Sequence, residues 1–148
     1  MREELFFVEY IGESMNTVLG HPKGRFVYAG IKKKVGEAMQ VAGVQHIEPF
    51  ERPIEIWYYP LVTRLKSGHI SKSFDCLNFG ITYKTIEDWL VKFGKLEDDS
   101  REFVYGAHMM RAQLAKDDRA GIMVKINELE VNPFPKQSPL ELPEQAVF

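Results

Sequence analysis

The residues of this chain that could do chemistry are concentrated in one stretch, from Asp75 to Asp99. Asn78 follows Asp75 by three residues, and two adjacent carboxylates, Asp98 and Asp99, close the stretch. Clustered carboxylates repel one another, and a hard divalent cation that takes oxygen ligands is the usual compensation. Such an ion activates water and stabilises the charge that develops on a phosphate under attack. The stretch therefore indicates a metal site for phosphate chemistry.

Between these carboxylates, Lys84 and Asp88 are four residues apart and share one face of a predicted helix. A lysine at this place would add positive charge where the oxygens of an attacked phosphate gain negative charge. An alternative stays open for these groups. Lys84 with Asp88 is also an ordinary solvated surface pair, and two successive aspartates between a helix and a strand are common in turns.

The predicted helix between the two groups of carboxylates is the main difficulty for a single site. About fifteen helical residues at roughly 1.5 Å each would separate Asp75 from Asp99 by roughly 22 Å. A shorter or tilted helix would bring them closer, and a second subunit could complete the site across a dimer interface. The spacing alone does not decide between these arrangements.

The elements that must position these residues follow from the pattern of apolar side chains. Runs of β-branched and aromatic residues predict strands at 5–11, 53–59, 103–109 and 120–129. Apolar residues three and four apart predict helices over 28–42, ending near Gly43, and over 79–93, ending at Gly94, with Asn78 as a capping residue. The order β-α-β-α-β-β predicts an α+β fold, in which two main helices pack on a small mixed four-stranded sheet. Residues 116–119 suit a hairpin turn between the last two strands.

The composition favours one soluble domain. The chain has 148 residues, of which 45% are hydrophobic and 27% charged, so collagen-like, low-complexity and wholly disordered classes are excluded. Prolines are frequent in residues 132–148, so we expect a domain over 1–131 and an extended Pro-rich tail. Cys76 is the single cysteine, and no apolar run is long enough to span a bilayer. A cytoplasmic protein is therefore expected.

The charge is unevenly distributed, although the formal net charge is only −2. Residues 21–72 contain nine bases and four acids, a local excess of five positive charges. The basic residues at the first helix could contact phosphates, or could simply form a solvated face: Lys23, Arg25, Lys32, Lys33 and Lys34.

The polar residues of the central stretch resemble the signature of the RusA family, the phage and prophage crossover-junction endodeoxyribonucleases known as Holliday junction resolvases. The resemblance covers about 26 residues closely, in a pattern of spaced polar and apolar positions. These positions are Asp75-Cys76-Leu77-Asn78, Lys84, Asp88-Trp89-Leu90, Gly94 and Asp98-Asp99-Ser100.

The resemblance implies a metal-dependent endodeoxyribonuclease of DNA recombination and repair. Members of the family are small homodimers that cut branched DNA with Mg²⁺ or Mn²⁺ by paired nicks. Carried over to this chain, Asp75 and Asp99 are the leading metal ligands and Asp98 is their neighbour. Lys84 is the catalytic lysine, acting with Asp75 and Asp99. The resemblance gives positioning roles to Asn78 and Asp88.

Two departures from the family pattern leave an alternative function open. Leu77 stands where the archetypal resolvase has an acidic residue before the motif asparagine, and the spacing from Asn78 to Lys84 is longer than in the archetype. Glu87 or Asp88 could supply the missing carboxylate. The alternative is a non-catalytic DNA-binding or recombination accessory module with a degenerate metal site.

The resemblance also suggests DNA contacts and a partner for the tail. Asn16 matches an early asparagine motif of the family, and the residues expected to contact DNA before Asp75 are Arg64, Lys66, His69 and Lys72. The tail sequence Gln-Ser-Pro-Leu-Glu-Leu at 137–142 resembles the short peptide by which replication proteins dock on a sliding clamp. The other possibilities are a disordered tail and one that braces a second subunit, and no membrane partner is expected.

Overall fold

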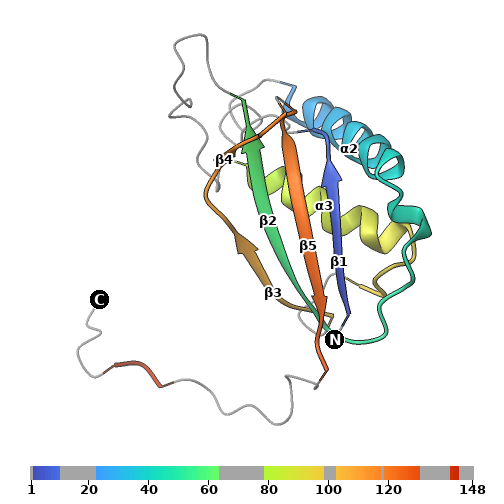
Figure 1. Ribbon diagram of the computed structural model, residues 1–148, viewed down its shortest axis with the longest axis vertical. Helices are drawn as coiled ribbons and strands as arrows, with labels where there is room; N and C mark the ends of the chain where they lie inside the picture. The colour runs from blue at the N-terminus through green and yellow to red at the C-terminus, as the bar shows by residue number, and fades with distance from the viewer. Residues whose placement is uncertain are drawn as a thin grey trace.

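The molecule has two layers, a mixed β-sheet and two helices that cover one of its faces (Figure 1). The computed structural model describes residues 2–10, 23–63, 79–98, 103–117, 119–130 and 141–143. The elements in chain order are β1 (Glu3–Val8), α2 (Gly24–Val41), the 3-10 helix η1 (Val44–His46), β2 (Ile54–Val62), α3 (Gly80–Lys92), β3 (Val104–Met109), β4 (Gln113–Leu114) and β5 (Gly121–Glu128). The predicted α+β class with two main helices is confirmed for these residues.

The sheet differs from the prediction in its number of strands and in their order. The strand order is β1-β5-β2-β3, and β4 pairs with the end of β2, so the sheet has five strands rather than four. β5 is antiparallel to both β1 and β2, whereas β3 and β4 are parallel to β2. The expected hairpin between the last two long strands is therefore wrong, because β2 lies between β3 and β5.

The burial of the two strands explains this order. In β5, Ile122, Val124 and Ile126 have no exposed surface, as a central strand requires, whereas most of β3 is exposed, as at an edge. After β3 the chain stays beside β2, where Leu61 pairs with Gln113, and then returns as β5 on the other side of β2. The chain does reverse its direction between β4 and β5, but the reversal passes the end of β2.

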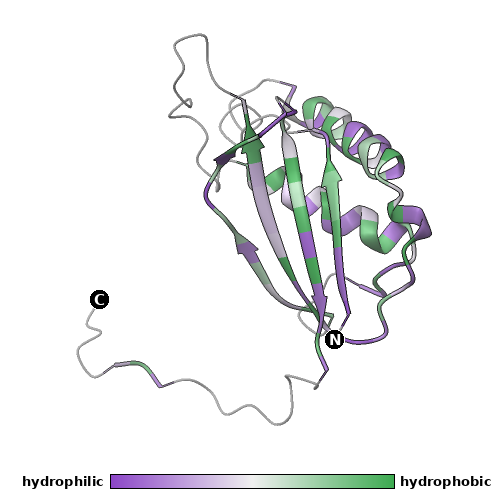
Figure 2. Cartoon of the chain, viewed as in Figure 1, coloured by the Kyte–Doolittle hydropathy of each residue, from purple (hydrophilic) through white to green (hydrophobic). Residues whose placement is uncertain are grey.

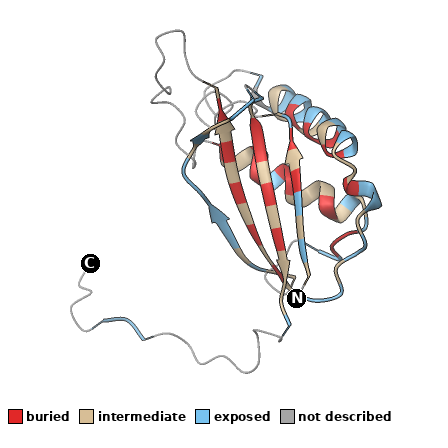
Figure 3. Ribbon diagram, viewed as in Figure 1, coloured by how far each residue is buried: buried red, intermediate tan, exposed pale blue. Residues whose placement is uncertain are grey.

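The alternation of side chains along β2 separates the two faces of the sheet (Figure 3). Ile54, Ile56 and Tyr58 point toward the helices and are fully buried. On the opposite face, the Trp57 ring stacks on His108 with a centroid distance of 4.7 Å, and the Lys125 Nζ atom lies 4.6 Å from the Trp57 ring. Strand pairing aligns these three residues in one row across β5, β2 and β3.

The helices form where the apolar spacing predicts them. α2 buries Ile31, Val35 and Met39 at steps of four, and α3 buries Tyr83, Ile86 and Leu90 at steps of three and four, in each case on one stripe. Gly43 and Gly94 follow the two helices with φ angles of 82° and 73°, a left-handed conformation that favours glycine and ends a helix. Both predicted helix ends are confirmed.

The tail prediction is only partly within the described residues. Residues 141–143 are exposed and belong to no helix or strand. Residues 131–140 and 144–148, which carry most of the expected clamp-docking peptide, lie outside the described residues.

Candidate functional site

The candidate site is built on α3, because Lys84, Asp88 and Asp98 are the predicted site residues that the structure describes. The remaining predicted site residues lie outside the described part of the chain: Asp75, Asn78, Asp99, Asn16, Arg64, Lys66, His69 and Lys72. The N-cap position of α3 belongs to Phe79 and not to Asn78 as expected, one residue later than the sequence suggested.

Lys84 and Asp88 form an ion pair on the outer side of α3. The Nζ atom of Lys84 lies 3.3 Å from Oδ1 of Asp88, one helical turn along, with side-chain exposures of 53% and 25%. The predicted shared helix face is therefore confirmed. An exposed pair at this spacing stabilises a helix by only about 0.5 kcal/mol. The pair places the lysine ammonium at the protein surface, one turn from the Asp88 carboxylate.

Behind this pair, the Glu87 carboxyl group lies at the contact between α3 and β2. Burial raises the pKa of Glu87 above its ordinary value, and the charge of Asp88 adds to the rise. The Lys84 ammonium and a hydrogen bond with the Tyr58 hydroxyl act in the opposite direction. The Lys84 ammonium and the carboxyl groups of Glu87 and Asp88 therefore interact within two turns of α3, in a region that is partly shielded from water.

Tyr58 anchors this region from the sheet. Its hydroxyl proton is shared between the Glu87 carboxyl group and the Tyr83 carbonyl oxygen, which lies 3.3 Å from the hydroxyl oxygen, and the rings of Tyr58 and Tyr83 stack at 4.5 Å. Burial, followed by the charge of Glu87, raises the pKa of Tyr58 well above its ordinary value. From its place in the sequence, Glu87 is expected only as a substitute carboxylate, and the sequence pattern does not single out Tyr58. The alternation of β2 places Tyr58 on the helix-covered face and is the signal that could have found it.

Asp98 lies beyond the opposite end of α3. The helix has 13 residues, so it is roughly 20 Å long. After Gly94 the chain is fixed by hydrogen bonds from Lys95 N to the Leu90 carbonyl and from Phe50 N to the Lys95 carbonyl, which place it next to the residues that lead into β2. Asp98 follows this turn and is exposed. The two ends of the helix are thus roughly 20 Å apart, and Asp75 and Asp99, whose separation was expected from the sequence, lie outside the described residues.

The described residues can offer a phosphate the positive charge of Lys84, but they include no group of three possible metal ligands. Among residues 2–10, 23–63, 79–98, 103–117, 119–130 and 141–143, no three His, Cys, Asp or Glu side chains are grouped so that they could hold an ion. A metal at this site would therefore depend on Asp75 and Asp99, which flank the described α3 region in the sequence.

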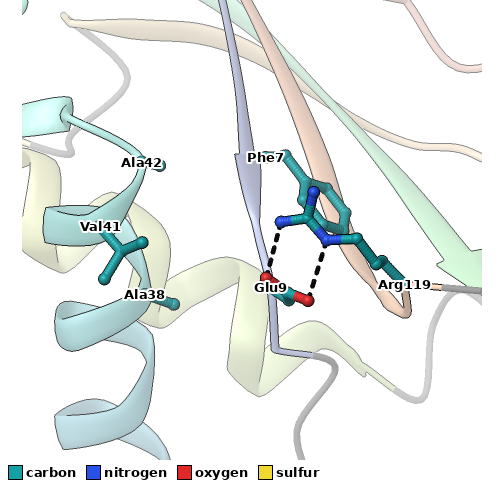
Figure 4. Close-up of a pocket in the computed structure, with 6 residues that line it drawn as sticks. All are labelled: Phe7, Glu9, Ala38, Val41, Ala42 and Arg119. Atoms are coloured by element: carbon teal, nitrogen blue, oxygen red, sulfur yellow. Dashed lines mark hydrogen bonds and ion pairs between the residues drawn. The ribbon is translucent and has the colours of Figure 1, made fainter. Parts of the chain in front are cut away.

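A separate cavity of about 450 Å³ lies between β1 and the last turns of α2 (Figure 4). Ala38, Val41 and Ala42 line one side of it. On the other side, Arg119 donates hydrogen bonds of 3.0 and 2.7 Å to the carboxylate of Glu9, and they lower the pKa of that carboxyl. The two charged groups that line this cavity are therefore paired with each other.

No protein-family model matches the chain, and no curated protein matches it significantly. Within the described residues, neither helix is both long and apolar enough to cross a membrane.

Proposed function

We propose that this chain is a Mg²⁺-dependent endonuclease that resolves branched DNA, similar to the RusA resolvases, and that it acts as a homodimer. The observation that carries the proposal is the Lys84–Asp88 pair at 3.3 Å. The RusA-like spacing gives Lys84 a catalytic role and Asp88 a positioning role, and the described structure is compatible with both. Mn²⁺ is expected to replace Mg²⁺, because the two ions accept the same oxygen ligands.

The proposed reaction is hydrolysis of one phosphodiester bond in each of two strands. A water oxygen forms a bond to phosphorus, and the bond from phosphorus to one sugar oxygen breaks. Negative charge grows on the phosphoryl oxygens in the transition state, where the Lys84 ammonium would stabilise it. Asp88 would keep that ammonium in place, and Tyr58 would fix this part of α3 against β2. A bound divalent ion would supply activated water and further charge neutralisation.

The proposed metal ligands are Asp75 and Asp99, with Asp98 as their neighbour. They lie before and after α3 in the sequence, and α3 is roughly 20 Å long. Two arrangements would bring these carboxylates together. The chain could return along the helix, or a partner subunit could supply one of them. The homodimer implied by the resemblance would serve the second arrangement and would also account for paired nicks.

The test is cleavage of a synthetic four-way DNA junction with and without Mg²⁺, followed on denaturing gels. We expect nicking that EDTA abolishes, and loss of nicking in Asp99→Asn with junction binding retained. Asp117→Asn, an exposed aspartate in the turn before β5, is the matched control and should cut normally. Wild-type protein that binds junctions but never nicks them over a range of Mg²⁺ and Mn²⁺ concentrations would refute the proposal.

The second candidate function is a non-catalytic DNA-binding module of recombination. Leu77 in place of a carboxylate favours it, and so does the position of Asp98 beyond the far end of α3 from Lys84. Isothermal titration calorimetry separates the two candidates: this module would release no heat with Mg²⁺ or Mn²⁺ and would keep its junction affinity. Comparing cleavage of a junction, a flap and a linear duplex at equal salt distinguishes a resolvase from a less selective nuclease.

A further inference from the structure

The outer surface of α2 combines basic side chains with an exposed aromatic ring and small residues. Phe26, Ala29, Gly30 and Lys33 lie along its solvent side, where the helix is largely exposed (Figure 3). These residues recur at steps of three and four, so they share one face. The flanks of this face carry Arg25, Lys32 and Lys34. We call these seven residues the α2 surface.

The charge of this helix is strongly positive in a chain that is slightly acidic overall. From residue 23 to the end of α2 there are five cations, Lys23, Arg25, Lys32, Lys33 and Lys34, and one carboxylate, Glu37, which gives a local charge of +4. No acidic residue lies in the first turn of the helix. Hydrophilic and hydrophobic bands alternate along α2, as an amphipathic helix requires (Figure 2). The helix thus buries its apolar stripe and leaves its basic residues toward solvent.

Three of the cations of α2 lie close to aromatic rings. Arg25 lies 5.0 Å from the centre of the Phe26 ring, Lys32 lies 5.6 Å from that of Tyr28, and Lys34 lies 6.0 Å from that of Tyr10. Phe26 is 61% exposed, although phenylalanine gains most from burial. A Cβ atom at Gly30 would meet nothing within 4 Å, so the surface beside Phe26 is open.

We propose that the α2 surface binds DNA, with its cations on the sugar-phosphate backbone and Phe26 against an unpaired base. The identity of that DNA as a branched substrate rests on the proposed function. Phosphate neutralisation by lysine and arginine supplies most of the affinity of such surfaces, and aromatic rings add stacking on unpaired bases. Ala29 and Gly30 leave room for the backbone to approach the helix closely.

The geometry favours DNA over an acidic peptide as the occupant. From Arg25 to Lys34 the helix rises about 14 Å, a length along which duplex DNA presents roughly eight phosphates. An acidic peptide would match the charge but would have no use for the exposed Phe26 ring. α2 and α3 cover the same face of the sheet (Figure 1), and a hydrogen bond from Trp89 to the Lys32 carbonyl joins them.

The proposal is tested by binding, separately from cleavage. Fluorescence anisotropy with labelled four-way junction and single-stranded DNA is measured in EDTA over a series of KCl concentrations. We expect Lys33→Ala with Lys34→Ala to weaken junction binding by about tenfold near 0.1 M salt and to reduce the slope of log affinity against log salt by about 2. Phe26→Ala should weaken single-strand and junction binding by about fivefold or more without changing that slope.

The matched control replaces Arg111 and Lys116, two exposed cations in the connection from β3 to β5, by alanine. It should leave both affinity and slope nearly unchanged. The proposal is overturned if the α2 variant and this control behave alike, if wild-type protein binds none of the DNA probes, or if polyglutamate of equal charge competes as well as DNA. The protein could bind junctions through Lys33 and Lys34 and yet never cut them. That result would support the DNA-binding surface and refute only the nuclease proposal.

Discussion

The indole Nε1 of Trp89 donates a hydrogen bond of 2.7 Å to the carbonyl oxygen of Lys32, and this bond joins the two helices directly. Trp89 belongs to the same helix as Lys84, and Lys32 belongs to the α2 surface. Gly36 lies against the Trp89 ring, where the absence of a side chain lets the helices approach closely. The proposed catalytic lysine and the proposed DNA surface are therefore parts of one packed layer.

Replacing Gly36 by alanine is expected to destabilise the protein. The new Cβ atom would overlap the Trp89 ring, and such overpacking costs about 1 to 3 kcal/mol, more than the helix propensity gained. Gly30→Ala in the same helix is the matched control, since its Cβ atom would meet open space and should stabilise the protein by about 0.5 to 1 kcal/mol. Urea unfolding followed by circular dichroism measures both. Equal effects of the two substitutions would contradict the packing described here.

Removing the Lys84 ammonium is expected to slow DNA cleavage and to leave folding intact. Lys84→Ala should reduce the single-turnover nicking rate by about 10² to 10³, because a preorganised charge is lost from the transition state. Asp88→Asn should have a smaller effect, since the ammonium would lose its orientation and keep its charge. Lys92→Ala, at the last turn of α3, is the control. A Lys84→Ala protein that cuts at the wild-type rate would remove Lys84 from the mechanism.

The ionisation of Glu87 is expected to make stability depend on pH. Burial raises the Glu87 pKa in the folded protein, so the folded state binds a proton more tightly than the unfolded state. Stability is then greatest below the ordinary glutamate pKa and falls as pH rises through the raised one. Glu87→Gln has no carboxyl group to titrate and should not lose this stability. The difference between its thermal midpoint and that of the wild type should therefore shift in favour of the variant as pH increases across this range.

Glu37→Gln is the control for this titration, because it removes one exposed carboxylate from α2. If Glu37→Gln changed the midpoint with pH as strongly as Glu87→Gln does, burial of Glu87 would not be the cause. A Glu87→Gln difference that does not change with pH would show that the carboxyl group is solvated in both states.

Removing the Tyr58 hydroxyl is expected to strengthen this pH dependence. The hydrogen bond from Tyr58 lowers the pKa of Glu87, so Tyr58→Phe should raise that pKa further and move the loss of stability to higher pH. The variant also loses the hydrogen bond to the Tyr83 carbonyl, at a cost of about 1 kcal/mol. Titration of the Glu87 carboxyl carbon by NMR in both proteins measures the shift. A lower pKa in the variant would contradict the contact.

The helices could be predicted from the sequence, and the sheet order could not. Apolar spacing and the stop residues Gly43 and Gly94 act locally, so both helices were found with their C-terminal ends, whereas α2 begins at Gly24, four residues before the predicted start. Strand pairing is non-local: whether β5 pairs with β3 or lies beside β2 depends on which strand has the more buried pattern. β4 has only two residues, and it is a strand because it pairs with the end of β2.

The difference between local and non-local contacts also explains which parts of the candidate site could be predicted from the sequence. The Lys84–Asp88 pair is a local feature of one helix, so its spacing sufficed to predict it. The contact between Glu87 and Tyr58 depends on where α3 crosses β2, which no local pattern specifies. Asp98 could be placed after the helix, but its surroundings depend on the turn that brings Lys95 next to Phe50.

The position of β5 between β1 and β2 has a consequence for synthesis on the ribosome. β5 is the last strand to be translated and occupies the middle of the sheet. Until about residue 128 has left the exit tunnel, β1 and β2 have no strand between them to pair with. The sheet described here can therefore be completed only after β5 has emerged from the tunnel. In that interval, chaperones would meet an incomplete β-layer with two unpaired edges.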